Sequence, residues 1–92
     1  MKIMLSFNKT LTRLAGNSFG REVYDIQVKD NINFKEMNII EFPKEIEDIA
    51  ISFVQGFTQG IFENINKDEF SKFFTIKGNQ KVIDKFNRSV YF

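Results

Sequence analysis

The residue types available for chemistry are few, because the 92-residue sequence contains neither histidine nor cysteine. Disulfides, thiolate chemistry, structural zinc and an imidazole base are therefore excluded. Any catalysis would depend on carboxylates, hydroxyls or lysine alone, and no reaction can be derived from their arrangement. We expect a protein that is not an enzyme, with no catalytic residue, no cofactor and no metal.

Two segments have the composition of a ligand site. Residues 16–21 place glycines, a hydroxyl and a cation before a predicted helix. They match neither the Walker pattern nor the dinucleotide fingerprint, so we interpret them as a helix cap with a flexible turn. Glu45, Glu47 and Asp48 suggest a metal or paired-acid site, but acidic residues ahead of a helix N-terminus are an ordinary complement to the helix dipole.

Ser52 is the most interesting hydroxyl, because it stands near the start of a predicted helix. Ser52 and Gln55 have the spacing of a capping box, in which each side chain bonds the backbone amide of the other residue. Gly56 and Gly60 lie four residues apart on one face of the same helix. These glycines form a flat binding strip, or they let a neighbouring element pack tightly, and the sequence leaves both interpretations open.

Length and composition set the class of protein. Ninety-two residues indicate one domain, residues 1–92, and 42% hydrophobic residues with twelve phenylalanines are enough for a core. The 13 basic and 12 acidic residues form no long run of one sign, which argues against nucleic acid and anionic membrane as partners. The first fifteen residues lack a secretory signal and the longest uncharged run is too short to span a bilayer, so we expect a soluble cytoplasmic protein.

The elements that must position these residues are centred on a strand followed by a helix. The apolar run ended by Pro43 predicts a strand at 37–42, because proline donates no ladder hydrogen bond. Residues 49–62 carry no charge, and their apolar side chains recur at helical spacing. This pattern predicts a helix at 52–65 that is buried or covered by a partner.

Patterns elsewhere in the chain predict the remaining elements. Residues 3–7 and 11–14 are extended segments around a polar break and predict a hairpin. The other expected elements are a helix at 18–29, a buried strand at 73–76 and an amphipathic helix after an Asn79 N-cap, with Phe34 packing back onto the sheet. The strand–helix–strand order favours a parallel crossover. The expected core contains Phe42, Phe53, Phe57, Phe74, Ile76 and Phe86.

This order of elements resembles the STAS-like domains of unknown function, small bacterial relatives of the anti-sigma-factor antagonists. The resemblance lies in a helix at 17–29, a strand at 38–42, an acidic connection at 45–49 and a helix opened by Ser52 and Phe53. Residues 73–86 match the later strand and helix. The resemblance implies an α/β fold, with a small mixed sheet of about four strands and about three helices packed mainly on one face.

The resemblance also implies a function. It predicts a non-enzymatic protein-binding module in partner switching, monomeric or weakly dimeric, that binds a histidine-kinase-like ATPase or another regulator through residues 44–62. In the antagonist relatives a serine like Ser52 is phosphorylated by the partner kinase. One alternative is a phosphorylation-independent inhibitor or anti-defence protein of mobile-element origin, and another is a small enzyme or nucleotide binder using residues 16–21. The predicted partner-binding residues are Glu47, Asp48, Ser52, Gln55, Gly56, Gln59 and Gly60.

Overall fold

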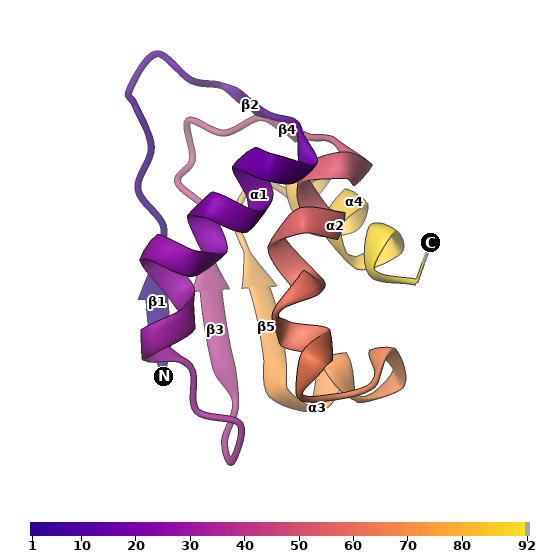
Figure 1. Ribbon diagram of the computed structural model, residues 1–92. Coiled ribbons are helices and arrows are strands. Elements are labelled where there is room, and N and C mark those ends of the chain that lie inside the picture. The colour runs from indigo at the N-terminus through magenta and orange to yellow at the C-terminus, as the bar shows by residue number, and fades with distance from the viewer. Residues whose placement is uncertain (92) are drawn as a thin grey trace.

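Strands and helices alternate along the chain, which confirms the predicted α/β class (Figure 1). The computed structural model describes residues 1–91. The strands are β1 (Lys2–Met4), β2 (Arg13–Leu14), β3 (Asn38–Glu41), β4 (Asp48–Ile49) and β5 (Phe74–Lys77). The α-helices are α1 (Asn17–Val23), α2 (Ile51–Gln59), α3 (Phe70–Phe73) and α4 (Gln80–Val90).

The strands form two small sheets, and both are parallel. One sheet has the order β1-β3-β5, and the other pairs β2 with β4. The helices α1 and α2 carry the chain back to the same end of the larger sheet, so successive strands run in one direction, as the predicted crossover requires. The expectation of a mixed sheet is therefore wrong, because every strand pair among the described residues is parallel.

The predicted N-terminal hairpin is also wrong. The polar break does form a turn, in which the Leu11 amide donates to the Asn8 carbonyl at 2.9 Å. The segments on either side of this turn join different sheets, because β1 pairs with β3 and β2 pairs with β4. A local turn signal could not reveal these long-range partners.

Helices cover one face of the three-stranded sheet, as predicted. Burial alternates along β5, where Phe74 and Ile76 are buried and Thr75 and Lys77 are exposed. The same alternation occurs in β1, where Ile3 is buried between exposed neighbours. Figure 1 shows α1 and α2 in front of this sheet. The opposite face carries the exposed side chains.

The predicted core is confirmed, because all six of its residues are buried. Phe42 lies at its centre, with ring centroids 6.5 Å from Phe53, 6.3 Å from Phe57 and 5.9 Å from Phe86. Phe34 packs edge-on against Phe74, as expected, at 6.1 Å. The strand end, α2 and α4 thus share one aromatic cluster.

The helices differ from prediction mainly at their ends. The first continues beyond α1 as a π-helical turn, Tyr24–Val28, which together with α1 fills most of the predicted 18–29. The second is shorter than predicted as an α-helix and continues as the 3₁₀ turn Ile61–Glu63. Neither α3 nor β4 was predicted. None of the helices formed by residues 1–91 is long and apolar enough to span a membrane.

Candidate partner-binding surface

Helices α1 and α2 cross with their backbones in direct contact. A Cβ placed on Gly20 would collide with the carbonyl oxygen of Phe53, and one placed on Gly56 would collide with the carbonyl oxygen of Asn17. Gly56 is accordingly buried. A Cβ on Gly60 would likewise press into the ring of Tyr24. Gly56 in α2 and Gly60 at its C-cap therefore serve tight packing, which decides between the interpretations that the sequence left open.

The predicted capping box at Ser52 is wrong. Helix α2 begins at Ile51, and the N-cap residue is Ala50, which makes no side-chain cap bond. Ala50 is extended because its amide continues the pairing of the smaller sheet and donates to the Leu14 carbonyl at 2.8 Å. This pairing fixes the helix start before Ser52.

Ser52 instead holds the loop before α1. Its Oγ accepts a hydrogen bond from the Gly16 amide at 3.0 Å, across 36 residues of sequence. Gly16 has φ +99°, a left-handed conformation that favours glycine. The Ser52 hydroxyl therefore fixes the loop between β2 and α1 against the first turn of α2.

The outward face of α2 is an uncharged strip, formed by Ile51, Gln55 and Gln59. These residues are spaced four apart, and all three are exposed. Ile51 is a large apolar side chain with 37% of its surface exposed. Four-residue spacing places these side chains in one row along the helix. Of the predicted partner-binding residues, Gln55 and Gln59 thus lie together on the surface.

Asp48 is surrounded by cations. Its carboxylate accepts from Lys85 Nζ at 2.8 Å and from Arg13 Nε at 3.2 Å, and Lys81 Nζ lies 3.8 Å away. The bond from Lys85, the backbone amide of Ile49 and the Arg13 side chain hold the pKa of this carboxyl well below its usual range. This predicted partner-binding residue is thus engaged within the chain.

A groove lies between the start of α2 and the end of α4. Its cavity of about 300 Å³ is lined by Ile51, Lys85, Arg88 and Ser89. Because Lys85 and Arg88 line this groove, the exposed apolar side chain of Ile51 has cationic neighbours.

Glu47, another predicted partner-binding residue, is exposed. Its backbone amide donates to the Thr12 carbonyl at 2.7 Å, which joins it to the β2 segment.

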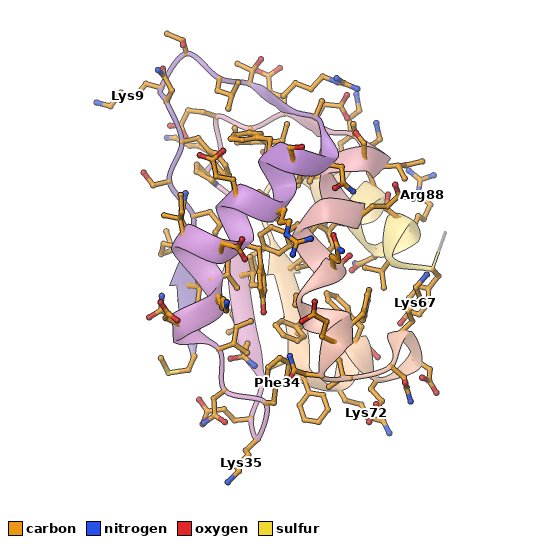
Figure 2. All side chains as sticks on the ribbon, in the orientation of Figure 1. Lys9, Phe34, Lys35, Lys67, Lys72 and Arg88 are labelled. Carbon is orange, nitrogen blue, oxygen red and sulfur yellow. The ribbon has the colours of Figure 1, made fainter. Side chains whose placement is uncertain are left out.

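The cations of this surface were not among the predicted site residues. Lys81, Lys85 and Arg88 follow the i, i+4, i+7 spacing of one helix face, so the final helix could have indicated them. Arg13 lies in β2, within the predicted extended segment 11–14, but that local pattern did not indicate its pairing with β4, which brings Arg13 to Asp48. Figure 2 shows Arg88 on the right of the molecule, with Lys72 below it on the same side and Lys35 at the lower end.

The two weaker candidate sites are residues 16–21 and the acidic residues Glu45, Glu47 and Asp48. The residues of the first site do not line one shared cavity. Arg21 lines a cavity of about 290 Å³ together with Tyr24 and Asp25, and Gly16 and Ser18 do not line it. Burial raises the pKa of Tyr24, with smaller contributions from Asp25 and Glu63. Within residues 1–91, no three acidic side chains gather in a way that could hold a metal ion.

Comparison of the chain with protein-family models, with curated proteins and with solved structures finds no match.

Proposed function

We propose that this chain is a STAS-like, non-enzymatic protein-binding module that acts in partner switching and binds a regulatory protein through residues 44–62. The observation that carries the proposal is the exposed, uncharged strip on α2 formed by Ile51, Gln55 and Gln59. An exposed apolar side chain at the edge of a groove, next to neutral polar groups, is suited to a protein contact.

The strip belongs to a rigid part of the fold. The backbone contact at Gly56 and the bond from the Gly16 amide to Ser52 hold α2 against α1. A surface that is already ordered loses less conformational entropy on binding than a mobile one does. The predicted binding residues Ser52, Gly56 and Gly60 thus contribute by fixing the surface from within.

Two further observations support a STAS-like binding module. Helices cover one face of the sheet, which agrees with the fold that the resemblance implies, although the paired strands are all parallel. The lowered pKa of Asp48 keeps its carboxyl ionised further into the acidic range than an ordinary aspartate. A general acid at neutral pH needs a raised carboxyl pKa, so Asp48 is not suited to that role.

The burial and hydrogen bonding of Ser52 favour a second candidate function. This candidate is a phosphorylation-independent inhibitor or anti-defence protein. The Ser52 side chain is half-buried and its oxygen already accepts from the Gly16 amide. A kinase would have to open this contact, and the phosphate would add a charge of about −1.5 to −2 at the loop. An inhibitor that uses the strip without modification avoids that rearrangement.

Affinity capture from the native cell, with quantitative mass spectrometry, tests the binding surface. The test variant combines Ile51→Asp with Gln55→Lys, and it should retain its fold because an acidic residue in the first helical turn complements the helix dipole. The control is Lys35→Glu, an exposed charge reversal at the opposite end of the molecule. We expect a protein captured by the wild type and the control, and lost with the test variant. An identical set of proteins with all three baits would refute the proposal.

Titration of the captured protein distinguishes the two candidates. Ser52→Asp introduces a fixed negative charge, and Ser52→Ala removes the hydroxyl without adding charge. If Ser52→Asp abolishes binding and Ser52→Ala does not, partner switching by phosphorylation is supported. Retained binding by both folded variants supports the phosphorylation-independent inhibitor.

A further inference from the structure

We propose that the partner contacts this protein with an acidic segment that lies along a cationic ridge formed by Arg13, Lys81, Lys85 and Arg88. The inference rests on the proposed function, since it names the chemistry of the partner for the same side of the molecule. The ridge borders the groove in which Ile51 is exposed. The partner segment would therefore cover the groove and the start of α2 together.

The ridge is assembled from two distant parts of the sequence. Lys81, Lys85 and Arg88 come from successive turns of α4, and Arg13 comes from β2. Asp48 joins the two parts, because it is within 4 Å of three of these cations. The Asp48 carboxylate thus gathers Arg13, Lys81 and Lys85 on one side of the molecule.

Positive charge exceeds negative charge along the ridge. Arg13, Lys81 and Lys85 share the single carboxylate of Asp48, which can balance only one of them. Arg88 bonds a backbone carbonyl, that of Asp84, at 3.3 Å. The neighbouring acidic residues are Asp84, whose carboxylate accepts from the Gln80 side chain at 2.9 Å, and Glu47, whose backbone amide donates to the Thr12 carbonyl.

This excess is local. Of the three acidic residues beside the four ridge cations, only Asp48 pairs with them, whereas the 13 basic and 12 acidic residues of the whole chain are nearly balanced. Charge complementarity directs such a surface to a negatively charged partner and speeds their encounter. Carboxylates of the partner would pair with Lys81 and Arg88, whose side chains are exposed.

The groove favours an acidic protein segment over a nucleic acid. The cavity of about 300 Å³ includes exposed Ile51, so an apolar side chain of the partner can be buried there between its acidic residues. A phosphate backbone would bring a dense row of negative charge past Asp48 and Asp84, which would repel it. A polypeptide can place its carboxylates to avoid these positions.

Fluorescence anisotropy with a labelled synthetic peptide tests the ridge. The peptide alternates acidic residues with leucine, and its control replaces each acid by the corresponding amide. The ridge variant combines Lys81→Glu with Arg88→Glu, which leaves Arg13 and Lys85 in place to hold Asp48. The matched control combines Lys35→Glu with Lys72→Glu, the same charge change on exposed residues outside the ridge. Thermal melts establish that both variants are folded.

We expect the wild type and the matched control to bind the acidic peptide, and added salt to weaken this binding. The ridge variant should bind at least about tenfold more weakly, which is the effect of about 1.4 kcal/mol. Equal binding by the ridge variant, or equal binding of the amide peptide, would overturn the inference. Tighter binding of single-stranded DNA than of the acidic peptide would also overturn it and identify a nucleic-acid surface.

The capture experiment separates the inference from the proposed function. If the ridge variant still captures the protein that Ile51→Asp with Gln55→Lys loses, the proposed binding surface on α2 is supported. The inference that the partner contacts the ridge with an acidic segment is then wrong. If neither variant changes capture, the proposed function fails. Loss of capture with both variants, but not with the matched control, supports both.

Discussion

A hydroxyl inside the first turn of a helix has a different role from one that caps the helix. A cap satisfies an amide of its own helix, whereas Ser52 satisfies the Gly16 amide at the start of another. The spacing of Ser52 and Gln55 is that of a capping box. The sequence therefore predicted that the Ser52 oxygen accepts from the Gln55 amide, whereas it accepts from the Gly16 amide. Only the pairing of β2 with β4, which brings Gly16 beside α2, reveals the partner.

Replacement of Ser52 by alanine should destabilise the fold through Gly16. The partly buried amide would lose its acceptor, at a cost of about 1–2 kcal/mol. Urea denaturation measures this loss, and amide exchange locates it. We expect faster exchange at Gly16, with Ser18→Ala as a control at an exposed position. Faster exchange at the Gln55 amide, with Gly16 unaffected, would restore the capping box.

Asp48 should make stability depend on pH in the acidic range. Its folded pKa lies below the ordinary 3.8, so the folded state binds the proton less readily than the unfolded chain. The contribution of the carboxylate is therefore complete above the unfolded pKa and is lost as pH falls below it. Wild type should exceed Asp48→Asn in stability at neutral pH, and the difference should shrink below about pH 4. Denaturant melts across this range measure the difference, and a difference that is constant with pH would contradict the pairing with Lys85.

At the scale of elements, the packing of α1 on α2 depends on two glycines that face each other's helix. Gly20 and Gly56 have backbone atoms of the opposite helix where a Cβ would stand. Glycine costs a helix about 1 kcal/mol relative to alanine, so its presence in both helices is unfavourable locally. The close approach explains why it is nevertheless there.

Alanine at either glycine should destabilise the protein, which is the reverse of the ordinary effect in a helix. Overpacking against a backbone that cannot move away costs about 1–3 kcal/mol, more than the helix propensity gained. Chemical denaturation of Gly20→Ala and Gly56→Ala measures the loss. Gln59→Ala, at an exposed position of α2, is the control. An unchanged or raised midpoint for Gly56→Ala would mean that the helices do not touch at this point.

Element positions were predictable from the sequence where the signal is local. The apolar run before Pro43 located β3, the uncharged segment located α2, and Asn79 located the start of α4. Asn79 is the N-cap residue by position, but its side-chain amide Nδ2 donates to the Lys44 and Ile46 carbonyls and holds the loop between β3 and β4. Strand pairing was not predictable, because a two-residue strand such as β4 carries no periodicity.

The candidate site shows the same division. Gln55 and Gln59 were among the partner-binding residues predicted with the resemblance, and they lie together on the surface. The role of Gly56 needed the position of α1, and the cations around Asp48 needed the meeting of β2, β4 and α4. A sequence without runs of one charge gave no sign that distant cations would gather.

At the scale of the molecule, the fold presents two different surfaces. The helical side carries the α2 strip and the cationic ridge, whereas the uncovered sheet face carries exposed residues such as Met4, Thr75 and Lys77. Parallel sheets are usually covered on both faces, so the open face is a rival docking surface. The proposed function therefore makes a claim about which side of the molecule the partner covers.

Amide hydrogen exchange of the isolated protein and of its complex with the captured partner tests this claim most directly. Amides at a docked surface exchange more slowly, because local opening is suppressed where the partner binds. We predict slower exchange in the complex at Ile51–Gln59 and along Gln80–Val90, with β1 and β5 unchanged. Slower exchange confined to β1 and β5 would place the partner on the open sheet face and contradict the account.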